Sequence, residues 1–163
     1  MAFSIIACVG KNLELGKNND LIFHFKDDMK FFRETTRGHT IVMGLNTWKS
    51  LGEKPLPNRQ NLILSHAPLT ELPENTAQIP DFDTFVKENK DTDEEIFIIG
   101  GATIYKIFLP YARTLYLTEV DAEKEADVFF PEFNKEDYDL TTLQSLTENQ
   151  TNFNINKYTR KEK

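Results

Sequence analysis

The fold class follows most directly from one ten-residue run, Ile96-Phe97-Ile98-Ile99-Gly100-Gly101-Ala102-Thr103-Ile104-Tyr105. An apolar, β-branched run ends at two glycines, and a helical pattern starts directly after them. The same order recurs in Ile41-Val42-Met43-Gly44-Leu45-Asn46-Thr47-Trp48. Short apolar strands that alternate with helices favour an α/β sheet over a helical bundle or a β-sandwich.

Working outward from this run, the periodicity of the chain predicts the remaining elements. Strands are expected at residues 3–9, 40–43, 61–64, 95–99 and 114–120, and helices at 27–36, 46–51, 82–89 and 103–109. Residues 138–158 are polar, tolerate β-structure and show no helical period, which predicts two antiparallel edge strands joined near Asn149. No repeat or linker interrupts the chain, so we expect a single domain over residues 1–163.

Composition excludes several classes of partner. The formal charge of −7 and the pI near 5.0 argue against nucleic acid or an anionic membrane as the main partner. One cysteine allows no intrachain disulfide, and the N-terminus resembles a strand more than a signal peptide. No apolar run reaches the length of a membrane span. We therefore expect a cytoplasmic protein.

Asp28 is the first candidate for chemistry. It follows Asp27, the predicted N-cap, at the start of a helix, and it shares a stripe with Phe31 and Phe32. A carboxylate on an apolar stripe either meets a cationic or amidine-like partner or keeps its proton to unusually high pH. The alternative is that Asp28 faces solvent and only complements the helix dipole. The local sequence leaves both interpretations open.

The two glycine-ended strands are the second candidate. Glycine lets backbone approach a ligand, and the N–H groups that follow favour an anion, so two such ends brought together can hold a pyrophosphate. Each is equally compatible with an ordinary tight turn, and Asn46 or Thr47 with a helix cap. The chain has no G-x-G-x-x-G motif and no P-loop.

The other chemistry-bearing side chains divide into one anion-binding candidate and several weak ones. Arg59 follows the stiff turn Pro55-Leu56-Pro57-Asn58, and a fixed guanidinium suits a carboxylate, although a surface arginine beside a turn is the alternative. His66 follows a predicted strand, where it could meet a phosphate. The three histidines are scattered, so we predict no metal site. Cys8 is interpreted as a small core residue and not as a nucleophile.

Taken together, these residues resemble the dihydrofolate reductase family along the whole chain. The resemblance rests on pieces whose order and spacing match: Ile6-Ala7, Gly16, Asp28 with Phe32, Met43-Gly44, Thr47-Trp48-Lys49-Ser50-Leu51-Gly52, Pro55-Leu56-Pro57-Asn58-Arg59-Gln60-Asn61, Ile99-Gly100-Gly101, Tyr105, Leu115-Tyr116-Leu117-Thr118, and Asp127 before Phe130-Pro131.

The resemblance implies NADPH-dependent reduction of 7,8-dihydrofolate to tetrahydrofolate by a monomer that antifolates inhibit. It implies a single α/β domain whose central, mostly parallel twisted sheet of about eight strands has flanking helices and an antiparallel C-terminal edge. Asp28 would then be the catalytic residue, binding the pterin and promoting protonation of N5. Thr118 would support its carboxylate.

The resemblance also implies the remaining site residues. The substrate would contact Ile6, Phe32, Leu51 and Leu56, with backbone carbonyls from Ile6 and Ile99 and with Arg59 on the glutamate carboxylate. NADPH would contact Ala7, Gly16, Leu21, Gly44, Asn46, Thr47, Gly100, Gly101, Ala102, Thr103 and Tyr105, and Ser65 and His66 would lie at the 2'-phosphate.

The chain departs from the family pattern before the acidic helix. Phe23 stands where the family usually has tryptophan, and Ile22 and Lys26 stand where it has prolines. Losing these prolines is expected to loosen the loop. Leu45 and Thr103 stand where basic residues often occur, which leaves Ser65 and His66 to distinguish NADPH from NADH. Two rival functions are a riboflavin-pathway pyrimidine reductase and a non-catalytic pterin- or nucleotide-binding protein.

Overall fold

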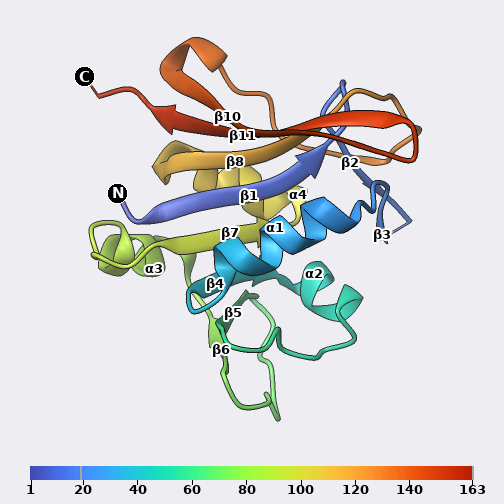
Figure 1. Ribbon diagram of the computed structural model, residues 1–163. Helices are drawn as coiled ribbons and strands as arrows, with labels where there is room; N and C mark the ends of the chain where they lie inside the picture. Colours follow the sequence, from blue (N-terminus) through green and yellow to red (C-terminus); the bar gives the residue numbers. More distant parts are fainter. Residues whose placement is uncertain (19, 163) are drawn as a thin grey trace.

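The computed structural model describes residues 1–18 and 20–162, which form an α/β fold around one large sheet (Figure 1). The sheet has eight strands in the order β10-β11-β8-β1-β7-β4-β5-β6. All neighbours are parallel except the pairs β10–β11 and β11–β8, which are antiparallel. Their bounds are β1 Phe3–Val9, β4 Thr40–Gly44, β5 Gln60–Leu64, β6 Thr76–Ile79, β7 Ile96–Gly100, β8 Ala112–Val120, β10 Tyr138–Glu148 and β11 Thr151–Arg160.

Helices cover both faces of this sheet. They are α1 Lys26–Thr36, α2 Leu45–Ser50, α3 Phe82–Asn89 and α4 Ala102–Phe108, with short 3₁₀ turns η1 Leu109–Tyr111 and η2 Lys135–Asp137. On one face α3 and α4 pack on Phe3, Ile5 and Leu115. On the other face Phe31 and Phe32 of α1 and Trp48 of α2 pack near Ile6. Because successive strand residues point to opposite faces, Ile5 and Ile6 belong to different cores.

A second, three-stranded antiparallel sheet was not expected from the sequence. It consists of β2 Glu14–Lys17, β3 Asp20–Leu21 and β9 Val128–Phe129, in the order β3-β2-β9. These strands have four residues or fewer and contain charges and a glycine, so they carry no period of their own. They form because β2 pairs with β9, more than 100 positions away along the chain. Strand β6 was also missed.

The main elements of the sequence analysis are confirmed, with shifts of one or two residues at their ends. The C-terminal strands are joined through Asn149 and Gln150, whose φ angles of 52° and 64° suit a tight hairpin turn. The predicted N-cap Asp27 is wrong. Helix α1 begins at Lys26 and its N-cap is Phe25, so Asp27 lies inside the first turn. Among the described residues no helix is long and apolar enough to cross a membrane.

Candidate active site

Asp28 lies against the neighbouring strands β1 and β8. Helix α1 places it over the register pair Cys8 and Thr118, and the Thr118 hydroxyl donates a hydrogen bond to Asp28 Oδ1. Burial raises the pKa of Asp28 above its ordinary value of 3.8, although hydrogen bonds from Thr118 and Cys8 act in the opposite direction. The interpretation of Asp28 as a solvent-facing acid is therefore wrong. The structure places a desolvated carboxylate with few protein partners on this face.

An apolar wall lies on the same face of the sheet. It brings together five of the predicted substrate contacts with the fully buried Trp48 and Phe97. The five are Ile6, Phe32, Leu51, Leu56 and Ile99. Ile6 comes from β1, Ile99 from β7 and Phe32 from α1. Leu51 lies at the end of α2 and Leu56 in the turn before β5, so the wall exists only in the folded chain. Such a wall suits a flat aromatic ligand whose polar edge meets Asp28.

Arg59 is held by the protein and is only 8% exposed. Its Nε donates to Thr36 Oγ1 at 2.9 Å, Nη1 to the carbonyl of Pro57 at 2.7 Å and Nη2 to that of Arg33 at 3.2 Å. Burial, then the charges of Arg37 and Arg33, lowers the pKa of Arg59. A guanidinium has five N–H donors, so part of this fixed group is left for an anion. The interpretation as a free surface arginine is wrong.

The two glycine-ended strands meet in the middle of the sheet. Met43 of β4 is in register with Gly100 of β7, and a Cβ on Gly100 would lie 3.5 Å from Thr47 Oγ1 and 3.3 Å from the Tyr105 hydroxyl. Gly100 has φ of 130°, which favours glycine. Tyr105 donates to the Ile6 carbonyl at 2.8 Å, which ties β1 to this junction. At Gly101 the nearest atom to an added Cβ is Thr47 Oγ1, at 3.8 Å, so the backbone there has room for close approach by a ligand.

Neither of the helices at this junction has a side-chain cap. The N-caps are Gly44 for α2 and Gly101 for α4, so the alternative that Asn46 or Thr47 caps its helix is wrong. Asn46 is exposed, while Ala102 and Thr103 form the first turn of α4. A Cβ on Gly44 would lie 2.8 Å from Ile104 Cγ1, so this glycine also permits the close packing of β4 on α4. Ala7 lies beside the junction on β1.

Comparison with known proteins agrees with this geometry. The family model described as dihydrofolate reductase matches residues 2–160. The chain belongs to the dihydrofolate reductase family. It is 38% identical over 155 residues to a dihydrofolate reductase of Bacillus subtilis, covering 91% of this chain and 87% of that relative. It is 37% identical over 142 residues to that of Haemophilus influenzae, with coverages of 86% and 85%.

A solved structure of the same family has the same fold. Dihydrofolate reductase from Enterococcus faecalis, complexed with NADP(H) and RAB-propyl, matches with a TM-score of 0.86 and 26% identity. The match covers 98% of this chain and 96% of that one. The sequence-based assignment to the dihydrofolate reductase family and its α/β fold is thereby confirmed.

The remaining predicted contacts follow β5 or lie on the small sheet. Ser65 and His66 follow β5; the Ser65 hydroxyl donates to the carbonyl of Ala67 at 3.0 Å, and His66 is exposed. Gly16 and Leu21 are paired in the small sheet, which Asp127 fastens through its N–H to the Gly16 carbonyl at 3.0 Å and its carboxylate to the Asn18 N–H at 3.1 Å.

Two functional positions were missed by sequence reasoning. Cys8 is not merely a core residue, because its thiol lies at Asp28, and burial together with that carboxylate raises the pKa of Cys8. Thr36 links α1 to Arg59, accepting from Nε while its own hydroxyl donates to the Phe32 carbonyl. The strand register of Cys8 and Thr118 could have revealed the first. No sequence signal reveals the second.

Proposed function

We propose that this protein reduces 7,8-dihydrofolate to 5,6,7,8-tetrahydrofolate with NADPH. The observation that carries the proposal is the part-buried Asp28–Thr118 pair beside an apolar wall, with the fixed Arg59 at the far end of α1. A pterin, an aromatic linker and a carboxylate tail need these three environments in this order. Membership of the dihydrofolate reductase family supports the same assignment.

Asp28 acts at the pterin end. One carboxylate oxygen takes the Thr118 hydroxyl, and the group keeps acceptor capacity for the ring N3–H and the exocyclic amino group. Its raised pKa means that it holds a proton to higher pH than an exposed aspartate. The reaction adds a hydride at C6 and a proton at N5, and Asp28 promotes that protonation. Cys8 and Thr118 fix the orientation of the carboxylate.

The residues of the glycine junction fit a dinucleotide. Gly101 places backbone without a side chain next to Thr47, with room for a pyrophosphate to approach, and Gly100 lies directly before it against Thr47 and Tyr105. Ala7, Asn46, Ala102 and Thr103 border it, with Gly16 and Leu21 on the small sheet. When bound, NADPH supplies the hydride. Ser65 and His66 are assigned to its 2'-phosphate.

The remaining roles concern the tail and the assembly. Arg59 binds the glutamate carboxylate, since Thr36 and two carbonyls keep its guanidinium from turning away. A monomer and a cytoplasmic location stay predictions from the sequence, as does the boundary of the single domain at residues 1–163.

The direct test follows NADPH oxidation with and without dihydrofolate, then adds a diaminopyrimidine antifolate. We expect turnover that requires dihydrofolate and is blocked by the antifolate. Binding of dihydrofolate without turnover would contradict the proposal and favour a non-catalytic pterin-binding protein. Turnover of a pyrimidine intermediate instead would favour the riboflavin-pathway reductase.

The role of Asp28 is tested by Asp28→Asn, with the exposed Asp27→Asn as the matched control in the same helical turn. We expect turnover at pH 7 to fall about 100-fold or more in Asp28→Asn and to recover partly at acidic pH, where solvent supplies the proton. Asp27→Asn should stay within about twofold. Rates like those of the unmodified protein across pH 5 to 9 would remove Asp28 from this role.

The assignment of His66 is tested by His66→Ala. We expect the variant to bind NADPH more weakly while its affinity for NADH is unchanged, because only NADPH carries the 2'-phosphate. Equal losses for both cofactors would remove His66 from that site.

A further inference from the structure

We propose that Glu148 and Lys124 are positioning residues that hold the connecting segment, residues 22–26, and thereby fix the start of α1 and Asp28. This inference rests on the proposed dihydrofolate reduction. The connecting segment leads from β3 into α1 and contains no proline. Its two polar anchors come from parts of the chain about 100 and 120 positions away.

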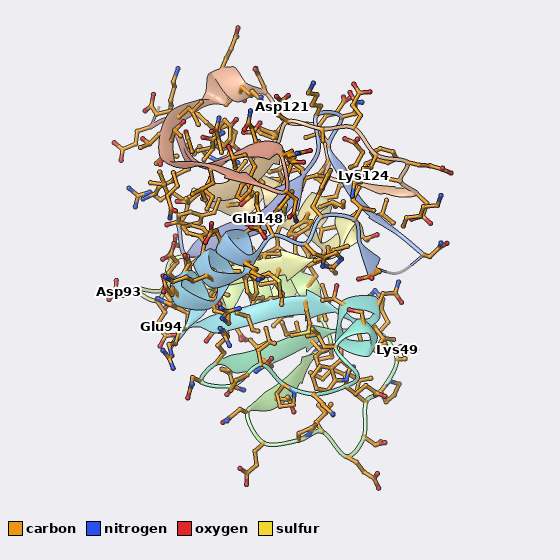
Figure 2. All side chains as sticks on the ribbon, turned by 45° about the vertical axis from the view of Figure 1, so that its right-hand side comes forward. Lys49, Asp93, Glu94, Asp121, Lys124 and Glu148 are labelled. Carbon is orange, nitrogen blue, oxygen red and sulfur yellow. The ribbon has the colours of Figure 1, made fainter. Side chains whose placement is uncertain are left out.

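Glu148 anchors the last residue of the connecting segment. Its Oε1 accepts the Lys26 N–H at 3.0 Å, and Lys26 is the first residue of α1. The first N–H groups of a helix have no partner within the helix, and Phe25 offers no side-chain cap. Glu148 thus supplies the missing acceptor from the end of β10, beside the start of α1 in Figure 2. Asp28 follows two residues later.

The second carboxylate oxygen of Glu148, Oε2, has a different environment from Oε1. Oε2 is buried and has no hydrogen-bond partner among the described residues. A buried carboxylate oxygen without a partner is unfavourable, so Glu148 is not placed here to optimise stability. The contact that it does make is to the backbone that carries Asp28.

Lys124 anchors the first part of the connecting segment. Its Nζ donates to the Ile22 carbonyl at 3.2 Å and lies 5.2 Å from the centre of the Phe23 ring. The backbone N–H of Lys124 donates at 2.9 Å to Oε2 of Glu14, a residue that is only 2% exposed. Burial would raise the pKa of Glu14, but backbone N–H donors outweigh it and keep that pKa low. The backbone of Lys124 is therefore held by Glu14, while its side chain contacts the connecting segment.

An apolar stack holds the middle of the segment. The ring centres of Phe23 and Phe25 lie 6.1 Å apart, and those of Phe25 and Phe153 lie 4.4 Å apart, both nearly parallel. This stack supplies the burial that keeps the segment on the protein. The two polar anchors can therefore be removed without releasing the segment, which makes the inference testable in folded variants.

The test uses proline as a backbone probe at position 26. Phe25 has φ of −110° and ψ of 134°, the conformation that a residue before proline adopts, and proline is favoured at the first helical position. Lys26→Pro is thus compatible with the backbone but has no N–H for Glu148. If Glu148 acts through that N–H, removing the Glu148 side chain has no further effect on kcat in the Lys26→Pro background.

We measure kcat and the KM for dihydrofolate in Glu148→Ala, Glu148→Gln, Lys26→Pro and the Lys26→Pro/Glu148→Ala double variant. Glu148→Ala should lower kcat about fivefold to tenfold, the scale of one ordinary hydrogen bond. Glu148→Gln, which keeps an acceptor oxygen, should recover most of that loss. In the proline background Glu148→Ala should change kcat by less than about twofold, since no contact is left to remove.

Three outcomes would overturn the role of Glu148: equal losses in both backgrounds, no recovery with glutamine, or a lower melting temperature at unchanged kcat. The control is Asp139→Ala, an exposed acid at the other end of β10. Failure of the proposed function itself is distinguishable, because the unmodified protein would then show no dihydrofolate-dependent turnover.

Lys124→Met keeps the apolar stem over Phe23 and removes the donor to Ile22. We expect kcat to fall about threefold, as for an exposed contact. The matched control is Lys135→Met, since Lys135 also lies over a ring, that of Tyr158 at 5.9 Å, on the other face of the sheet. Equal effects of the two substitutions on kcat would overturn the role of Lys124.

Discussion

Two consecutive residues of β8, Thr118 and Glu119, each belong to a polar pair, on opposite faces of the same strand. Thr118 meets Asp28 on the face of α1. On the other face Glu119 Oε1 accepts from Asn156 Nδ2 at 3.1 Å and from the Tyr158 hydroxyl, and Oε2 lies 3.6 Å from Lys135 Nζ. Both pairs place an acid next to a hydroxyl, yet their surroundings differ.

The difference lies in how much of each acid the protein has already used. Both oxygens of Glu119 have protein partners. Burial, and to a smaller extent the nearby Glu119 carboxylate, raises the pKa of Tyr158, so its phenol stays a hydrogen-bond donor. Among the described residues, Asp28 has a hydroxyl and a thiol beside it, and it is desolvated as well. A saturated acid stabilises the fold, whereas an unsaturated one keeps capacity for a ligand.

The largest effect on stability is expected for Glu119→Ala. It leaves the Asn156 amide and the Tyr158 hydroxyl without their acceptor, so the free energy of unfolding should fall by about 2–4 kcal/mol. Turnover of the remaining folded protein should stay within about twofold, since Glu119 faces away from the pocket. Urea denaturation and steady-state rates check this. A loss of turnover without a loss of stability would break the comparison.

A smaller effect, on catalysis, is expected for Thr118→Val. The valine has the same shape but cannot donate, so the pKa of Asp28 should rise further, because the Thr118 hydrogen bond lowers it. We expect kcat/KM for dihydrofolate to fall about tenfold and its pH profile to move to higher pH. The free energy of unfolding serves as the control. An unmoved pH profile would show that Thr118 does not act on the carboxylate.

A third effect, opposite in sign, is expected for the stability of Asp28→Asn. A carboxyl whose pKa is higher in the folded chain than 3.8 binds its proton more tightly when folded. Unfolding free energy therefore falls as pH rises through that raised pKa. The ligand-free variant should be about 1 kcal/mol more stable at pH 7. Denaturation at pH 4 and 7 checks this; a destabilised variant would contradict it.

The smallest effect is expected for Lys135→Met. The ion pair with Glu119 spans 3.6 Å and the lysine side chain is 63% exposed, so removing it should change stability by at most about 0.5 kcal/mol. Thermal melting with and without added salt measures this. A larger loss would mean that Lys135, and not Asn156 and Tyr158, holds Glu119.

Sequence patterns predicted what depends on local periodicity. The apolar strands β1, β4, β5, β7 and β8 and all four helices were found because each carries its own pattern. The small sheet was not, because β2 is stabilised by β9 and by Asp127 rather than by its own residues. The N-cap of α1 was misplaced for a similar reason, because the N–H of the first helical residue, Lys26, is bonded to Glu148 from a distant strand.

The site shows the same division. Asp28, Arg59 and the glycines were candidates from their local patterns, and the resemblance to dihydrofolate reductases gave them roles and added Thr118. Cys8 was assigned to the core because a thiol inside an apolar strand gives no sign of what faces it. The departures at Ile22 and Lys26 were expected to loosen the connecting segment. In the structure the Lys124 ammonium donates to the Ile22 carbonyl, and the Lys26 N–H donates to Glu148. A proline at position 26 would have no N–H for this second contact.

The position of β11 has a consequence for the order in which the protein is made. This strand, Thr151–Arg160, lies between β8 and β10, and Thr118 is in register with its Ile155. Phe153 of β11 and Glu148 of β10 also contact the connecting segment. A ribosome delivers residues in sequence, and domains generally fold as units. The surroundings of Asp28 are therefore complete only after β11 has emerged from the ribosome, so a nascent chain cannot form them from the residues up to β10 alone.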